Sequence, residues 1–401
     1  MRFASRVNRL AGKGAEAWTL HAKALDQQHE TGKDVLFLTV GEPDFDTPLA
    51  IQQAAIASMR SGNTHYSPIV GTKALRSAIA DWHTELTDQP VSAEQVVVTS
   101  GAQCALFCAM QCLAQPGDEV IATDPRYSTY EAVIGATGAD LVSVPLLPDR
   151  NFTLDLASLR AAVTPRTRVI LLNSPHNPTG AVLHPDTLEA VAALCCEADV
   201  WLVSDEVYGA LTYGPRHRSP AALPGMEDRC VVVSSLSKSH AMTGWRVGWA
   251  IAPEAMAGHL YNLVLSMLYS CPGFIQDASV VAIREASGEV RRMQAAYRRR
   301  RDLMAPWLDA LPGLSCASPE GGMFVMLDVR RSGLDAQSFA ERLLAEERVA
   351  VLPGEGFGKQ AAGFCRLSLG FSDETLTEAC RRIEAFTLRL EAENTLLTAA
   401  P

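Results

Sequence analysis

From residue 95 onward, short runs rich in Val and Ile alternate with longer segments of helical pattern. The runs cover residues 96–99, 119–122, 141–144, 169–172, 200–204, 230–233 and 247–251. This alternation predicts an α/β fold with an open, mostly parallel central sheet and helices on both of its faces. In such sheets ligands bind beyond the carboxyl ends of the strands. We therefore look for functional residues at the strand ends.

The pattern changes after residue 251, where helical segments dominate up to residue 308. Strands near 324–328, 349–351 and 365–369 then mix with helices near 336–347 and 373–390. This mixture predicts a second, small α+β domain. With 401 residues the chain is long enough for more than one domain. We expect three parts: an N-terminal segment that joins the small domain (1–47), a large α/β domain (48–290) and the small C-terminal domain (291–401).

Composition and charge disfavour several classes of protein. The formal net charge of -10 disfavours a nucleic-acid or membrane-surface binder. The basic run at residues 298–301 has a helical pattern and predicts a solvated helix face. No uncharged apolar stretch approaches the roughly 18 to 20 residues of a membrane span, and the first residues lack the apolar core of a signal peptide.

Ten cysteines without a secretion signal suggest reduced thiols in a cytoplasmic protein. Cys104, Cys108 and Cys112 recur every fourth residue of one expected helix. No His lies near them, so we interpret them as packing residues and expect no metal site.

Polar residues follow several of the predicted strands. Ser100-Gly101-Ala102-Gln103 closes one strand and opens a helix, where free backbone N–H groups form a natural seat for a phosphate. Asp205 ends a hydrophobic strand, and a carboxylate buried there needs a cationic partner. These positions predict a site at the strand ends that binds an anion and a cation.

Lys238 lies in the polar segment that follows the apolar run 230–233. Ser235 and Ser237 stand beside it, and Arg246 lies eight residues further on. An amine with nearby hydroxyls and an arginine suits a carbonyl compound that carries a phosphate, because the amine forms a Schiff base and the other groups hold the anion. Pyridoxal 5′-phosphate (PLP) fits this description.

With Gly244 and Gly248, residues 235–248 resemble the PLP-attachment signature of the class I/II aminotransferases, which belong to the fold type I PLP enzymes. Further blocks of this family occur in the same order, at residues 41–48, 65–71, 173–180, 203–208 and 364–369. The resemblance covers nearly the whole chain and implies a PLP-dependent transaminase.

The resemblance assigns a role to each matching residue. Lys238 would hold PLP and later act as general base on the substrate α-carbon, while Asp205 would keep the ring nitrogen protonated. Asn177 and Tyr208 would contact the phenolic oxygen, and Tyr127 would stack on the ring. The phosphate would be held by Ser100, Gly101, Ala102, Gln103, Ser235, Ser237, Arg246 and, across a homodimer interface, the other subunit's Tyr66.

On the substrate side, the same resemblance implies that Arg366 grips the α-carboxylate with its planar fork. Gly41 would contribute a backbone contact near that carboxylate. Asn177 would lie close to it as well.

The donor is suggested by departures from the aspartate-specific pattern. Gln103 stands where the bacterial aspartate aminotransferases often have Lys, and Ala17 stands where they use a hydroxyl residue. Several blocks look closer to the bacterial arginine–pyruvate transaminases, which implies L-arginine as donor and pyruvate as acceptor. Glu16 could then meet a guanidinium group.

The sequence leaves three alternative functions open. They are an aspartate or broad-specificity aminotransferase, a PLP-dependent C–S lyase, and a non-catalytic PLP-binding protein. The intact set of Lys238, Asp205 and Arg366 disfavours the last of these.

Overall fold

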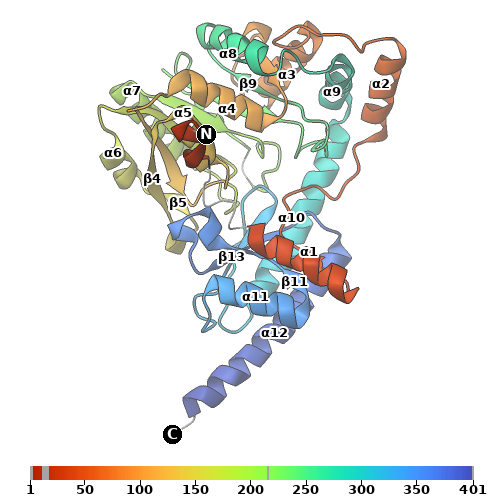
Figure 1. Cartoon of the computed structure of the whole chain (residues 1–401), viewed down its shortest axis with the longest axis vertical. Coiled ribbons are helices and arrows are strands. Elements are labelled where there is room, and N and C mark those ends of the chain that lie inside the picture. Colours follow the sequence, from red (N-terminus) through yellow and green to blue (C-terminus); the bar gives the residue numbers. More distant parts are fainter. Residues whose placement is uncertain (1–2, 11–17, 215, 400–401) are drawn as a thin grey trace.

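The computed structural model of the protein describes residues 3–10, 18–214 and 216–399 (Figure 1). Its largest element is an eight-stranded sheet. In spatial order the strands are β2 (Val96–Thr99), β9 (Gly248–Ile251), β8 (Cys230–Ser235), β7 (Trp201–Asp205), β6 (Thr167–Asn173), β3 (Glu119–Asp124), β4 (Asp140–Leu147) and β5 (Thr153–Leu154). All except β9 and β5 run in one direction, so the predicted mostly parallel sheet is confirmed.

Helices cover both faces of this sheet, as predicted. Successive strand residues point to opposite faces, so Leu202 and Val203 belong to two different hydrophobic clusters. One face packs against α2 (Leu49–Arg60), α3 (Lys73–Thr87), α6 (Leu156–Ala162), α7 (Pro185–Ala198) and α9 (Gly273–Glu285). The other packs against α4 (Ala102–Leu113), α5 (Tyr130–Thr137) and α8 (Glu254–Met267).

A second hydrophobic core lies beside the large sheet and has α+β character, as predicted (Figure 1). Its strands are β10 (Phe324–Asp328), β13 (Phe364–Ser368) and β12 (Leu352–Pro353) in one antiparallel sheet, with β1 (Leu36–Phe37) parallel to β11 (Val349–Ala350). Its helices are α1 (Thr19–Thr31), α10 (Ser287–Asp309), α11 (Ala336–Glu347) and α12 (Asp373–Ala399). The domain boundaries at residues 47 and 290 stay predictions.

Six short 3-10 helices complete the described secondary structure. They are Ser5–Arg9, Ala93–Gln95, Pro148–Arg150, Pro220–Ala222, Gly354–Phe357 and Lys359–Ala361.

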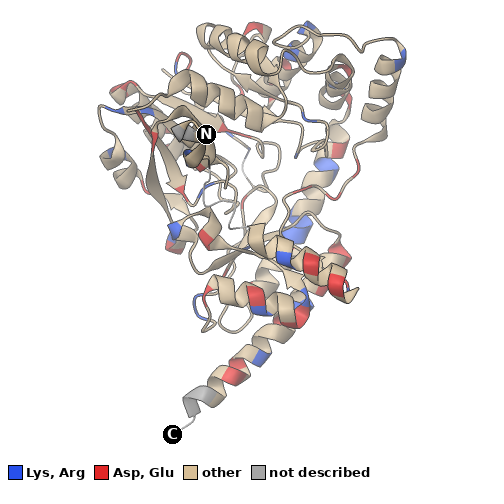
Figure 2. Cartoon of the chain, in the orientation of Figure 1, with Lys and Arg blue, Asp and Glu red and all other residues tan. Residues whose placement is uncertain are grey.

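Charged residues of both signs are interspersed along α11 and α12 (Figure 2). On α10, the prediction of a solvated basic face is wrong for Arg300, which is only 4% exposed. Its guanidinium donates to both carboxylate oxygens of Asp44 at 2.7 Å and to Asp373 at 3.1 Å. A bidentate pair of this kind compensates the burial of an arginine.

Among the described residues, no helix is both long and apolar enough to cross a membrane. All ten cysteines are free thiols. In the same part of the chain, no group of three or more His, Cys, Asp and Glu side chains is arranged to hold a metal ion.

Candidate active site

A cavity of about 240 Å³ lies where the carboxyl ends of β6, β7 and β8 face the second sheet. Twelve of the predicted site residues line it: Gly41, Ala102, Gln103, Tyr127, Asn177, Asp205, Tyr208, Ser235, Ser237, Lys238, Arg246 and Arg366. A larger hollow of about 910 Å³ elsewhere on the surface is lined by none of them. The described lining of the smaller cavity has three cationic side chains and one carboxylate, so the cavity suits an anionic guest.

Lys238 lies on the turn that follows β8, with its amine at the cavity. Its Nζ donates to the carbonyl oxygen of Gly41 at 2.6 Å. Burial lowers the pKa of the Lys238 amine to about 8; the Glu42 carboxylate opposes this shift, and Arg366 and Arg246 add to it. A lysine with such a pKa has a sizeable fraction of free amine near neutral pH, as a nucleophile requires.

Asp205 is the last residue of β7 and is only 7% exposed. Its Oδ2 accepts a hydrogen bond from the Tyr130 hydroxyl at 2.6 Å, and Oδ1 accepts one from the Val207 N–H at 3.3 Å. Burial raises the pKa of this carboxyl to about 6. No cationic side chain of the described residues forms an ion pair with it, so a cationic group on a ligand would satisfy it.

Arg366, on β13, presents the complementary feature from the second sheet. Its guanidinium donates to Asn177 Oδ1 at 3.1 Å and to the Thr39 carbonyl at 2.6 Å, while its Nε has no partner in the structure. Burial lowers the pKa of this guanidinium to about 10. The phenyl ring of Phe324 lies 4.2 Å from it. A buried arginine without a carboxylate among the described residues is suited to bind one from a ligand.

The start of α4 forms an anion seat beside Arg246. Gly101 precedes the helix with φ 83°, and a Cβ at this position would lie 2.6 Å from Nη2 of Arg246. A Cβ at Gly248 would lie 2.5 Å from the backbone nitrogen of Ala102. The two glycines therefore let the guanidinium and the helix N-terminus approach each other, an arrangement that attracts phosphate. Ser100 and Gly101 shape this seat without lining the cavity.

Amide and phenol groups lie around Asp205 at the cavity. Asn173 accepts from the Asn177 N–H at 2.7 Å and donates to the Asp205 carbonyl at 2.9 Å. The amide of Asn177 lies 3.5 Å from the Tyr208 hydroxyl, and burial raises the pKa of that phenol. The rings of Tyr127 and Tyr130 meet edge to face at 5.7 Å. These contacts bring the groups expected around an aromatic cofactor to one place.

Tyr66, the predicted contact across a dimer interface, does not line the cavity of its own chain. Tyr66 is 84% exposed, and its ring lies 4.5 Å from that of Tyr269. Glu16, together with Ala17, lies outside the described residues.

Residues 33–383 match the family model for aminotransferase class I and II. The chain belongs to this family. It is 54% identical to the arginine–pyruvate transaminase of Pseudomonas aeruginosa over 96% of this chain and 97% of that protein. It is 39% identical to the aspartate/prephenate aminotransferase of Thermus thermophilus, over 93% of this chain and 96% of that protein.

Solved structures of aminotransferases share the fold. The aspartate aminotransferase from Thermus thermophilus with maleate superimposes with a TM-score of 0.90 at 38% identity, over 96% of this chain and 100% of that one. The aspartate aminotransferase from Rhizobium meliloti gives a TM-score of 0.91 at 32% identity, over 97% and 99%. The protein is thus a transaminase of fold type I.

Class I/II aminotransferases of this fold depend on PLP, and the cavity of this transaminase fits that cofactor. It offers an amine at Lys238, a buried carboxylate at Asp205 that no cation of the described residues neutralises, and an anion seat at Arg246 and α4. These three features correspond to the aldehyde, the pyridine nitrogen and the phosphate of PLP.

Sequence reasoning missed several residues of this transaminase's site. Trp18, Thr243 and Phe324 line the cavity, and Tyr130 holds Asp205. Phe324 reaches the cavity from β10 of the second core and Trp18 from the position before α1, and nothing in their local sequence marks them. Tyr130 had a detectable signal only in its position, three residues after Tyr127 and at the start of α5.

Proposed function

We propose that this transaminase moves the amino group of L-arginine to pyruvate. The observation that carries this proposal is the 54% identity, over nearly the full length of both chains, to a protein named arginine–pyruvate transaminase. The neutral side chain of Gln103 supports it. Gln103 accepts a hydrogen bond from Thr129 at 3.0 Å and offers no cation to an acidic donor side chain.

The cofactor would be held at three points. Lys238 would carry it covalently, and Asp205 would face the protonated ring nitrogen, with Tyr130 and the Val207 N–H fixing the carboxylate. Ser235, Ser237, Arg246 and residues 100–103 would hold the phosphate, and Tyr127 would cover the ring. When bound, PLP supplies an aldehyde that condenses with amines and a ring that withdraws electrons from the substrate α-carbon.

The substrate would be oriented by the second sheet. Arg366 would bind the α-carboxylate through its guanidinium, while its contacts to Asn177 and Thr39 fix the plane of that group. Gly41 would lie close enough for a backbone contact, since its carbonyl already accepts from Lys238. With a carboxylate anchored here, the α-carbon is held next to the lysine amine.

When the substrate amine takes its place on the cofactor, Lys238 would become a free amine and would then transfer the proton. Its pKa of about 8 lets the amine accept a proton from the substrate α-carbon at neutral pH and then release that proton to a neighbouring atom. Tyr208 and the Asn177 amide would contact the phenolic oxygen and hold the ring system in one plane. The Lys238→Ala variant should fold and lose turnover.

A homodimer would complete the site. The exposed ring of Tyr66 suits contact with the phosphate in the other subunit. Large apolar side chains on α2 and α8 support a partner surface: Leu49, Ile56, Met59, Tyr261, Leu265 and Met267 are each more than a third exposed. The free thiols agree with the cytoplasm as its location.

The test follows the absorption of the bound cofactor after separate addition of L-arginine, L-alanine, L-aspartate and L-cystathionine. The proposal expects arginine to act fastest and pyruvate to restore the starting spectrum. If aspartate acts faster, the donor assignment is wrong. Release of pyruvate or ammonia from cystathionine without an acceptor would instead indicate a C–S lyase.

The guanidinium contact has its own test. We propose that Glu16 meets the guanidinium, and Glu16→Gln should then raise the KM for arginine and leave that for alanine unchanged. An unchanged KM for arginine would exclude Glu16 from this role.

A further inference from the structure

A buried ion pair lies on the far side of β7 from the cavity. Glu206 directly follows Asp205, and its carboxylate lies 2.8 Å from Nε2 of His217, with the two side chains only 3% and 1% exposed. Consecutive residues at a strand end point to opposite faces. Asp205 therefore faces the cavity, whereas Glu206 faces the packed interior under the sheet.

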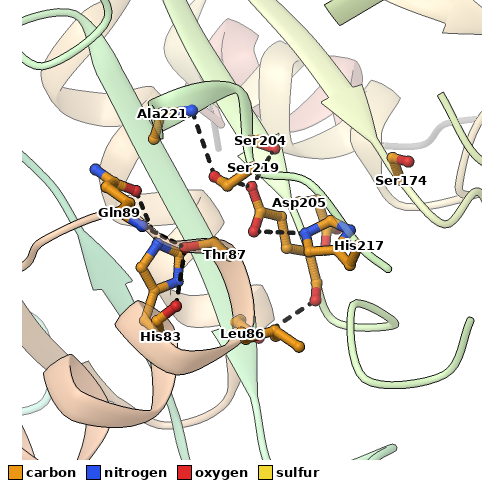
Figure 3. Close-up of polar contacts among 12 residues, drawn as sticks. His83, Leu86, Thr87, Gln89, Ser174, Ser204, Asp205, His217, Ser219 and Ala221 are labelled. Atoms are coloured by element: carbon orange, nitrogen blue, oxygen red, sulfur yellow. Dashed lines mark hydrogen bonds and ion pairs between the residues drawn. The ribbon is translucent and has the colours of Figure 1, made fainter. Parts of the chain in front are cut away.

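The Glu206 carboxylate is saturated with donors. Besides His217, it accepts from Ser204 Oγ at 2.8 Å and from Ser219 Oγ at 2.7 Å. Figure 3 shows Ser204, Ser219 and His217 gathered at this point, with His83 of α3 nearby. Burial acts to raise the pKa of the Glu206 carboxyl, but the charge of His217 and these hydrogen bonds lower it overall. Glu206 is thus a carboxylate held in one geometry.

The same residues hold the backbone that follows Asp205. The Glu206 N–H donates to the Val233 carbonyl at 2.8 Å, and the Glu206 carbonyl accepts from the Gly209 N–H at 2.9 Å. The His217 ring packs against this turn, because a Cβ at Gly209 would lie 3.0 Å from its Cδ2. The turn from residue 205 to 209 carries both Asp205 and Tyr208, so it places two groups of the cavity at once.

A buried ion pair contributes little net stability compared with apolar residues of the same size, but it can fix one conformation. We propose that Glu206 and His217 are positioning residues: they clamp the turn 205–209 from behind so that Asp205 and Tyr208 meet the cofactor ring. This inference rests on the roles given to those two residues under the proposed function.

Charge balance gives the pair a second effect on Asp205. The Glu206 carboxylate is the next residue and repels the Asp205 charge. His217 pairs with Glu206, and His83 and Cys230 are the other titratable groups facing it. Removing His217 would leave the Glu206 charge uncompensated close to the carboxylate that the ring nitrogen requires.

The experiment compares His217→Ala with His217→Gln, whose amide can replace Nε2 as donor to Glu206. We expect His217→Ala to weaken PLP binding to the apoprotein by about tenfold, as for the loss of a charge-assisted hydrogen bond. It should also speed amide exchange in the peptide covering residues 205–209 and lower kcat more than it raises KM. His217→Gln keeps a donor to Glu206 but not the charge, so it should restore the slow amide exchange and only part of the PLP affinity. Ser219→Ala is the milder variant to use if His217→Ala does not fold.

The controls separate positioning from general stability. His83→Gln alters a buried histidine beside the cluster that bonds to Gln89 and not to Glu206, and it should leave PLP binding unchanged. Asp205→Asn serves as reference: if it does not weaken PLP binding, the role of Asp205 under the proposed function fails. If Asp205→Asn weakens binding and His217→Ala lowers stability alone, the positioning inference is overturned.

Discussion

Replacing Asp205 with Asn should stabilise the apoprotein and at the same time weaken its hold on PLP. Asp205 is buried, receives two hydrogen bonds and has no cation among the described residues. Its ionised form is therefore poorly solvated until a ligand supplies a positive charge. Asn keeps the size of the side chain and removes the charge, so the two effects should have opposite signs.

The magnitude follows from the pKa of Asp205, which burial raises from 3.8 to about 6. The folded protein holds this proton more tightly than the unfolded chain, so the free energy of unfolding falls as pH rises from about 4 to about 6. The shift of roughly two units corresponds to about 3 kcal/mol at pH 8. Asn loses about 1 kcal/mol by disturbing one hydrogen bond. The expected net gain is about 2 kcal/mol.

Urea unfolding of the two apoproteins measures this gain, and it should shrink to less than half at pH 5 because Asp205 is then largely protonated. PLP titration of the same samples should show weaker binding. Asp118→Asn is the matched control: Asp118 is also buried, but it lies 3.4 Å from Arg168, so its replacement should not stabilise. An Asp205→Asn apoprotein less stable than the wild type at pH 8 would refute the reasoning.

Two further predictions concern the cationic residues of the cavity. Arg366→Lys should raise the KM for both the amino acid and the oxo acid by about tenfold or more, because an ammonium group cannot replace a planar fork; equal PLP affinity in both proteins is the control, and an unchanged KM would contradict the assignment. The rate at which the apoprotein attaches PLP should rise with pH and level off above about 8, the pKa of the free Lys238 amine. A rate that does not vary between pH 6 and 9 would show that this amine is not the attacking group.

The fold was predictable where local sequence alone decides the structure. The apolar run at residues 96–99 and the strand at 324–328 were placed with the bounds that the structure has. The strand β5, only two residues long, was missed because so short a segment carries no periodicity. The burial of Arg300 was missed because its partner Asp44 is 256 residues away in the chain.

The site residues also fall into those that local sequence predicts and those that it does not. Asp205 was predicted because it ends an apolar strand, and Lys238 because it lies in the polar segment that follows one. Trp18 and Phe324 were not found, because only the tertiary arrangement brings the start of α1 and the strand β10 to the cavity. Contacts of this kind depend on the tertiary arrangement and not on any local pattern.

Under the proposed function, the two ends of the substrate would be held by parts of the chain that belong to different hydrophobic cores. Lys238 lies on the turn after β8 of the large sheet, whereas Arg366 lies on β13, whose neighbouring residues belong to the second core. An amino acid bound at both residues would therefore link the two cores for as long as it stays bound. The measured affinity of the amino acid would include the free energy of holding the two cores together. A substrate without its carboxylate would lose this link between the cores as well as a hydrogen bond.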